Sequence, residues 1–100
     1  MAVLQQLSQR VSIVGWGSVS PLGCDAGSTW DGVLAERSGI RALTATWSDD
    51  LPVRISGCVP DAATASLEPL LLRRSDRCAQ LGLLAAREAW AMATAAIGGI

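Results

Sequence analysis

An apolar segment near the amino terminus, residues 10–14, runs directly into Gly15-Trp16-Gly17. This pattern predicts a short strand that enters a turn. A short apolar strand followed by helices is more typical of a buried parallel sheet than of a half-exposed hairpin. Because a buried strand must have its backbone N–H and C=O groups paired, at least one partner strand must come from elsewhere. The sequence therefore reads as the opening of a larger α/β domain.

The first predicted helix follows a Pro- and Gly-containing loop. Its apolar residues recur at helical spacing between residues 29 and 37, so one face is apolar. Asp25 or Ser28 is the expected amino-terminal cap, and Ser38-Gly39 is the expected end. Trp30 lies on the apolar face and is predicted to be a core residue.

A second strand and a long helix complete the predicted elements. Residues 51–59 alternate with period two, but Pro52 and Gly57 indicate a short or edge strand. Residues 60–69 form a connecting segment with room for one helical turn. A helix that is apolar on most sides, with Trp90 in the core, is expected from residue 70 to about residue 96, where Gly98-Gly99 ends it.

Composition and charge exclude several classes of protein. The 100 residues allow one domain at most, and residues 1–9 read as a polar arm ahead of it. The net charge of -1 gives no electrostatic reason to expect a nucleic-acid partner. The sequence contains no run of 18 apolar residues, so it predicts no membrane-spanning helix. The first ten residues do not resemble a signal peptide. We therefore expect a cytoplasmic protein.

The three cysteines predict neither a disulfide framework nor a metal site. Cys24, Cys58 and Cys78 are an odd number at wide, unequal spacing, whereas zinc sites use close pairs. A nucleophilic cysteine needs a nearby base, and the sequence contains no histidine. We expect three non-catalytic thiols and no catalytic residue within this chain.

The Gly15-x-Gly17 pair does not predict a dinucleotide site. Ser20 stands where the third glycine of that fingerprint belongs, and no acidic residue follows a second strand at the required distance. A tight strand exit explains the two glycines instead. Asp49-Asp50 is expected to be a solvated turn, because no second pair of ligands accompanies it. The sequence predicts no cofactor and no metal.

Five blocks of this sequence resemble the elongating β-ketoacyl-acyl-carrier-protein synthases of the thiolase superfamily. In the first block an apolar strand is followed by Gly-x-Gly and then by Ser-Pro-x-Gly. The other blocks correspond to the family's first helix with its exit, the next short strand, and the opening and body of the following helix. They are residues 11–23, 28–41, 51–57, 73–77 and 85–89. Together they cover roughly residues 10 to 92.

The resemblance implies the fold and the activity of the whole family member. Residues 10–100 would be the incomplete amino-terminal portion of a thiolase-like domain, which is built from two similar halves in α/β/α/β/α layers and works as a homodimer. The implied reaction is a decarboxylative Claisen condensation of an acyl thioester with malonyl-acyl carrier protein, in fatty-acid or polyketide synthesis. The family's nucleophilic cysteine and two histidines are expected beyond residue 100, so this chain alone should be inactive.

A small basic cluster, Arg73, Arg74 and Arg77, is predicted at the start of the long helix. The resemblance implies that Arg73 and Arg74 dock the acidic acyl carrier protein, because family members have basic side chains there. The other interpretation is a set of solvated or internally paired arginines, with Asp76 as a neighbour. Exposed pairs of that kind contribute under about 1 kcal/mol.

Two other functions remain open at this point. The chain could belong to a non-catalytic subunit similar to a chain-length factor, which keeps the fold and the partner surface without the nucleophile. It could also be an independent small module that binds an acidic partner through the arginine cluster.

Overall fold

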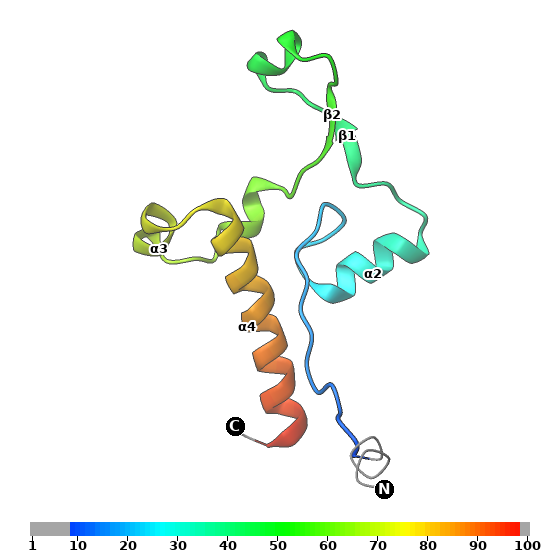
Figure 1. The fold of residues 1–100 in the computed structure, drawn as a ribbon, viewed down its shortest axis with the longest axis vertical. Coiled ribbons are helices and arrows are strands. Elements are labelled where there is room, and N and C mark those ends of the chain that lie inside the picture. The colour runs from blue at the N-terminus through cyan, green and yellow to red at the C-terminus, as the bar shows by residue number, and fades with distance from the viewer. Residues whose placement is uncertain (1–8, 99–100) are drawn as a thin grey trace, which may run out of the picture.

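The computed structural model describes residues 9–98, and most of the predicted polar arm, residues 1–8, lies outside this range. Short elements precede one long helix, which forms the spine of the molecule (Figure 1). In chain order they are α2 (Ala26–Leu34), β1 (Ile40–Ala42), the 3-10 helix η1 (Thr46–Asp50), β2 (Ile55–Gly57), the 3-10 helix η2 (Asp61–Thr64), α3 (Pro69–Arg74) and α4 (Arg77–Ile97).

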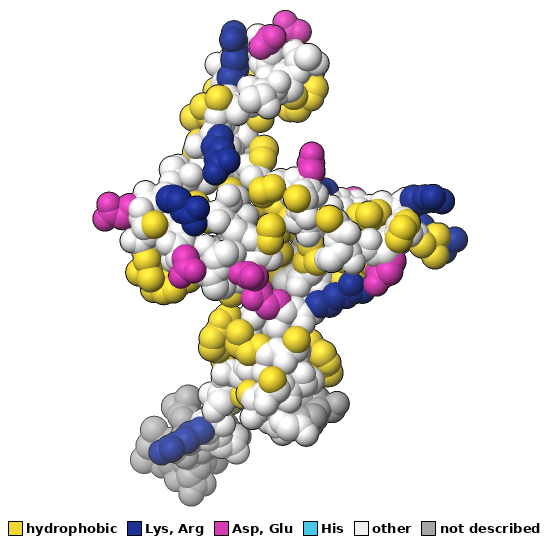
Figure 2. Space-filling model, turned by 180° about the vertical axis from the view of Figure 1, so that it is seen from behind, with side chains coloured by type: hydrophobic (Ala, Val, Ile, Leu, Met, Phe, Trp, Pro, Cys, Tyr) yellow, Lys and Arg dark blue, Asp and Glu magenta, His cyan; other side chains and the backbone are white. Residues whose placement is uncertain are grey.

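The molecule is open. Its radius of gyration is 18.6 Å, whereas a compact domain of 100 residues has a radius of about 13 Å. In the part of the chain that the structure describes, the buried apolar residues are Ala63, Leu67 and Ala93 alone. Figure 2 shows hydrophobic side chains spread over the visible surface. These residues therefore do not form a core sufficient for a stable domain by themselves.

The predicted strand at residues 10–14 has no partner among residues 9–98 and is not assigned as a strand. Its side chains face solvent: Val11 is 94% exposed and Ile13 is 81% exposed. A strand exists only as part of a ladder, so the prediction of a formed strand is wrong for this chain. The segment nevertheless runs alongside α4 in Figure 1.

The two glycines after this segment allow the backbone to lie directly on α4. A Cβ atom added to Gly15 would overlap the carbonyl oxygen of Ala89, and one added to Gly17 would overlap the carbonyl oxygen of Ala85. The Gly-x-Gly pair thus serves close packing of a loop against a helix, for which only glycine is small enough.

Helix α2 is capped at its amino end by Asp25, one of the two predicted caps. The Asp25 carboxylate accepts from the Ser28 backbone N–H at 2.7 Å, and the Asp25 N–H donates to the Ser28 hydroxyl, which completes a capping box. The predicted end at Ser38-Gly39 is wrong. The helix ends at Leu34, and Glu36 takes the left-handed conformation with φ of 58°. Trp30 is 59% exposed, so its prediction as a core residue is also wrong.

A two-stranded antiparallel hairpin projects from the body of the molecule (Figure 1). It pairs Ile40 with Gly57, Arg41 with Ser56 and Ala42 with Ile55. The predicted strand at residues 51–59 is reduced to β2, and β1 is too short to show a period in the sequence. The mixture of helices and strands agrees with the predicted α/β class, but the sheet in residues 9–98 is antiparallel and not parallel.

The predicted single helix from residue 70 is two helices. Helix α3 begins with Pro69 in its first turn and ends at Arg74. Asp76 then caps α4 by accepting from the Ala79 N–H at 2.8 Å. The Gln80 side chain secures the break, because its Nε2 donates to the carbonyl of Ser75 at 2.9 Å. A second donation from the same nitrogen reaches α3.

Helix α4 ends at Ile97 and is capped by Gly98 in the left-handed conformation, with φ of 74°, as the sequence predicts. Gly99 lies outside the described residues. Trp90 is 59% exposed, because nothing within residues 9–98 covers that face of α4; its prediction as a core residue is wrong here. None of the helices within residues 9–98 is long and apolar enough to cross a membrane.

Candidate functional site

The basic side chains of the predicted docking site lie on the last turn of α3. Arg73 and Arg74 are exposed, and neither has an ion-pair partner or a side-chain hydrogen bond among residues 9–98. In Figure 2, arginine side chains stand at the outer edge on the side where α3 lies. A helix carboxyl end favours positive charge, so the predicted placement at a helix start is corrected for these two residues.

Arg77 is separated from this pair by its contacts. It opens α4, and its guanidinium donates to the carbonyls of Val59 at 2.9 Å and Pro60 at 3.1 Å. It also lies 3.4 Å from the Thr64 hydroxyl and 3.9 Å from the Asp61 carboxylate. The predicted cluster of three arginines therefore divides into one structural residue and two that have no partner within residues 9–98.

The acidic residues around α3 do not neutralise the pair. Asp76 is occupied as the cap of α4. Glu68 lies 3.4 Å from Arg87 on α4. A backbone hydrogen bond and then the charge of Arg87 hold the pKa of Glu68 below its ordinary value. Among the described residues, Arg73 and Arg74 thus present two positive charges to solvent without an ion-pair partner.

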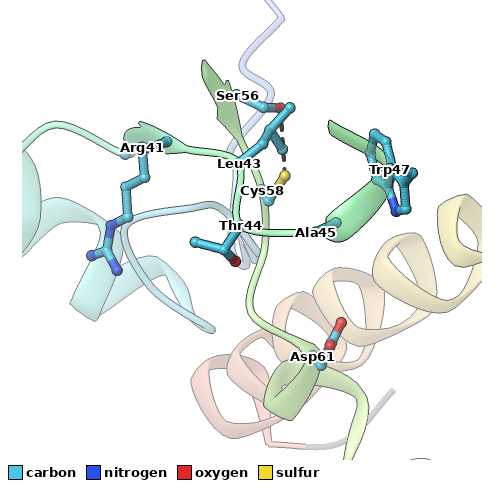
Figure 3. Close-up of a pocket in the computed structure, with 10 residues that line it drawn as sticks. Arg41, Leu43, Thr44, Ala45, Trp47, Ser56, Cys58 and Asp61 are labelled. Carbon is cyan, nitrogen blue, oxygen red and sulfur yellow. Dashed lines mark hydrogen bonds between the residues drawn. The ribbon is translucent and has the colours of Figure 1, made fainter. Parts of the chain in front are cut away.

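A second candidate site is an open cavity of about 360 Å³ beside the hairpin. Figure 3 shows the Arg41 side chain pointing away from Trp47 and Cys58. The Cys58 thiol donates to the Ser56 hydroxyl at 3.4 Å. With no histidine in the sequence, this chain supplies no imidazole base for that thiol. Its lining is Gly39, Arg41, Ala42, Leu43, Thr44, Ala45, Trp47, Ser56, Cys58 and Asp61.

The cysteines do not come together into a site. Cys24, Cys58 and Cys78 are all free and exposed. Within residues 9–98, no three His, Cys, Asp or Glu side chains gather closely enough to hold a metal ion.

One residue with a structural role went unnoticed in the sequence. Glu88 is the only acidic residue of α4, and its carboxylate accepts from the backbone N–H groups of Ser18 and Ala26. A lone carboxylate on a mostly apolar helix could have signalled it, because a partly buried charge requires partners.

Comparison with known proteins gives a consistent family. The family described as "Beta-ketoacyl synthase, N-terminal domain" matches residues 8–97. The chain is 35% identical over 83 residues to a 3-oxoacyl-[acyl-carrier-protein] synthase 2 of Coxiella burnetii, covering 82% of this chain and 20% of that protein. It is 34% identical over 84 residues to a putative polyketide beta-ketoacyl synthase 1 of Streptomyces cyaneus, covering 83% of this chain and 20% of that protein.

A 3-oxoacyl-[acyl-carrier-protein] synthase 2 of Staphylococcus aureus is 32% identical over 83 residues, which are 82% of this chain and 20% of that protein. The chain spans about a fifth of the length of the curated relatives it matches. Because the family match extends over nearly all of its residues, the resemblance seen in the sequence is confirmed: this chain belongs to the β-ketoacyl synthase family, to the amino-terminal domain of its members.

Proposed function

We propose that the intact protein is a 3-oxoacyl-acyl-carrier-protein synthase of fatty-acid or polyketide synthesis. An enzyme cysteine takes the acyl group from acyl carrier protein; malonyl-acyl carrier protein then loses CO2, and its α-carbon attacks the acyl carbon. That attack forms the new C–C bond and releases the cysteine thiolate. The observation that carries the proposal is the family match over residues 8–97. Residues 10–100 then form the amino-terminal portion of a thiolase-like domain in a homodimer.

Within this assignment the present chain contributes structure and a surface. It contains no histidine, so the cysteine and two histidines of the reaction cannot be assembled from its residues. The exposed apolar face of the molecule suits a piece that packs within a larger fold, because isolated proteins rarely expose so much apolar surface.

The proposed role of Arg73 and Arg74 is to dock acyl carrier protein. Both guanidinium groups are exposed and unpaired within residues 9–98, so forming a new ion pair breaks no existing one. Charges at the rim of an interface steer an oppositely charged partner and mainly raise the association rate. An acidic carrier would be attracted to this pair, and added salt would weaken the attraction.

The experiment is a condensation assay with two forms of the malonyl substrate, one on the carrier protein and one on pantetheine. The double variant Arg73→Glu/Arg74→Glu should lower kcat/KM for the carrier-bound substrate by at least about tenfold, since electrostatic steering changes association by that order. It should leave the pantetheine substrate unaffected. The matched control is Arg54→Glu, which reverses an exposed charge on the hairpin arm.

The outcomes separate the two parts of the proposal. Equal losses with both substrates, or no loss with either, would remove Arg73 and Arg74 from docking and leave the enzyme assignment intact. No condensation by the intact protein would reject the enzyme assignment. If such a protein then stimulated a catalytic partner subunit, it would be the non-catalytic subunit.

A further inference from the structure

The carboxylate of Glu88, midway along α4, holds two distant backbone groups. Its Oε1 accepts from the Ser18 N–H at 3.0 Å, and both oxygens accept from the Ala26 N–H, at 3.1 and 3.0 Å. Within residues 9–98, Glu88 takes part in no salt bridge. Among the described residues, this partly buried charge is thus stabilised by backbone donors, in hydrogen bonds that the charge strengthens.

The two donors are the ends of one loop. Ser18 begins it, and Ala26 ends it as the first residue of α2. Inside the loop, Ser20 and Gly23 exchange backbone hydrogen bonds of 2.9 and 3.2 Å, so the loop is closed on itself. The carboxylate also lies at the amino end of α2, where the helix dipole favours negative charge.

The tip of the loop reaches the base of the hairpin. A Cβ atom added to Gly39 would lie 2.7 Å from the Pro21 Cβ, and one added to Gly57 would lie 3.5 Å from the Pro21 Cγ. Gly39 precedes β1, and Gly57 ends β2. A continuous set of contacts therefore leads from Glu88 through the loop and Pro21 to the hairpin.

We propose that Glu88 is a positioning residue that makes loop 18–26, α2 and the hairpin base follow α4 as one unit. The assignment does not depend on the proposed function. Without the carboxylate, the Ser18 and Ala26 N–H groups lose their acceptor at a partly buried position, and both ends of the loop lose their hydrogen bonds to α4. Contacts of Pro21 with the hairpin base then no longer orient the hairpin relative to α4.

Hydrogen exchange followed by mass spectrometry on the intact protein tests this assignment. Glu88→Ala should speed amide exchange in residues 18–34 by roughly ten- to hundredfold, the range for losing hydrogen bonds to a charged group. Exchange in residues 40–57 should rise less, and exchange in α3 should stay unchanged. Glu88→Gln keeps one acceptor oxygen, so its effect should be intermediate. The matched control, Glu68→Gln, removes a carboxylate that pairs with Arg87, away from the loop, and should leave residues 18–34 unchanged.

The regional pattern decides the result. Equal acceleration in α3 and in residues 18–34 would mean that Glu88 acts only on global stability, and unchanged exchange in residues 18–34 would mean that it holds nothing. Either result overturns the assignment. If Glu88→Ala does not fold, Glu88→Gln alone carries the same comparison between regions.

Discussion

Gly17 lies so close to Ala85 that a Cβ atom on the glycine would overlap the carbonyl oxygen of the alanine. The same added atom would lie 3.0 Å from the Cβ of Glu88. The obstacle is mainly helix backbone, which cannot move aside as a side chain can. The path of the amino-terminal segment over α4 therefore depends on the absence of a side chain at this position.

Gly17→Ala should destabilise the intact protein by about 1–3 kcal/mol, the usual cost of overpacking a close contact. Gly82 provides the matched control, because it lies in α4 and an added Cβ there meets nothing within 4 Å. Gly82→Ala should raise stability by about 0.5–1 kcal/mol, since alanine is the better helix former. Urea unfolding of both variants measures the difference, and equal effects would mean that the close approach is unimportant.

Arg77→Ala should destabilise the contact between η2 and the start of α4. The guanidinium donates to the Val59 and Pro60 carbonyls, and losing hydrogen bonds of a charged donor costs about 1.5–3 kcal/mol. Arg87→Ala is the control, because it removes only an exposed pair with Glu68 and should change stability much less. Thermal unfolding of the intact protein compares them; a larger loss for Arg87→Ala would contradict this assignment.

The cap of α2 should weaken in acid. Hydrogen bonds from the Ser28 hydroxyl and backbone N–H hold the pKa of Asp25 below its ordinary value. A lowered folded pKa means that the stabilisation is complete above the unfolded pKa and is lost as pH falls through the folded one. Asp25→Asn keeps a good cap but does not titrate. The variant should therefore show a shallower loss of stability below about pH 4.

The pH experiment needs one more variant, because the pKa of Glu68 is also lowered and acts in the same direction. Combining Asp25→Asn with Glu68→Gln should flatten the acid limb further than either change alone. Unfolding midpoints recorded from neutral pH downward provide the measurement. An acid limb that Asp25→Asn leaves as steep as before would show that the capping box does not titrate with folding.

Residues 1–100 expressed alone should be poorly folded or should aggregate. Sixteen large apolar side chains are more than a third exposed, while only three apolar residues are buried in the described range. Exposed surface of this kind drives association. We expect strong binding of a hydrophobic dye and a broad thermal transition. A sharp cooperative melt of a soluble monomer would contradict the expectation and would favour an independent binding module.

Features set by neighbouring residues were predictable from the sequence. The capping box of α2 depends on Asp25 and Ser28, three positions apart, and the helical turn η2 fell within the predicted connecting segment. The end of the long helix at Gly98 was also predicted. These signals succeed because the atoms that make the contact are adjacent in the chain.

Features that depend on distant residues or on missing neighbours were not predictable. The break between α3 and α4 is held by the Gln80 side chain, and helix periodicity does not indicate such a contact. Trp30 and Trp90 lie on apolar faces, but their burial requires covering elements that these residues do not supply.

For the candidate site, the sequence identified Arg73 and Arg74, whose docking role stays a prediction. The different, structural role of Arg77 could not be predicted, because Arg77 donates to backbone carbonyls that lie far from it in the sequence. Glu88 was missed for the same reason. Its donors, Ser18 and Ala26, lie 70 and 62 positions away.

The exposure of the tryptophans makes the molecule its own optical reporter. Trp16, Trp30, Trp47 and Trp90 are 57–64% exposed and lie on four different parts of the chain. The sequence has no tyrosine, so its ultraviolet emission comes from these indoles alone. A protein segment or binding partner that covers one of these surfaces moves an indole from water into an apolar environment. The fluorescence emission of that indole then shifts to shorter wavelength. Replacing the tryptophans one at a time with leucine would then locate the covered surface without any added label.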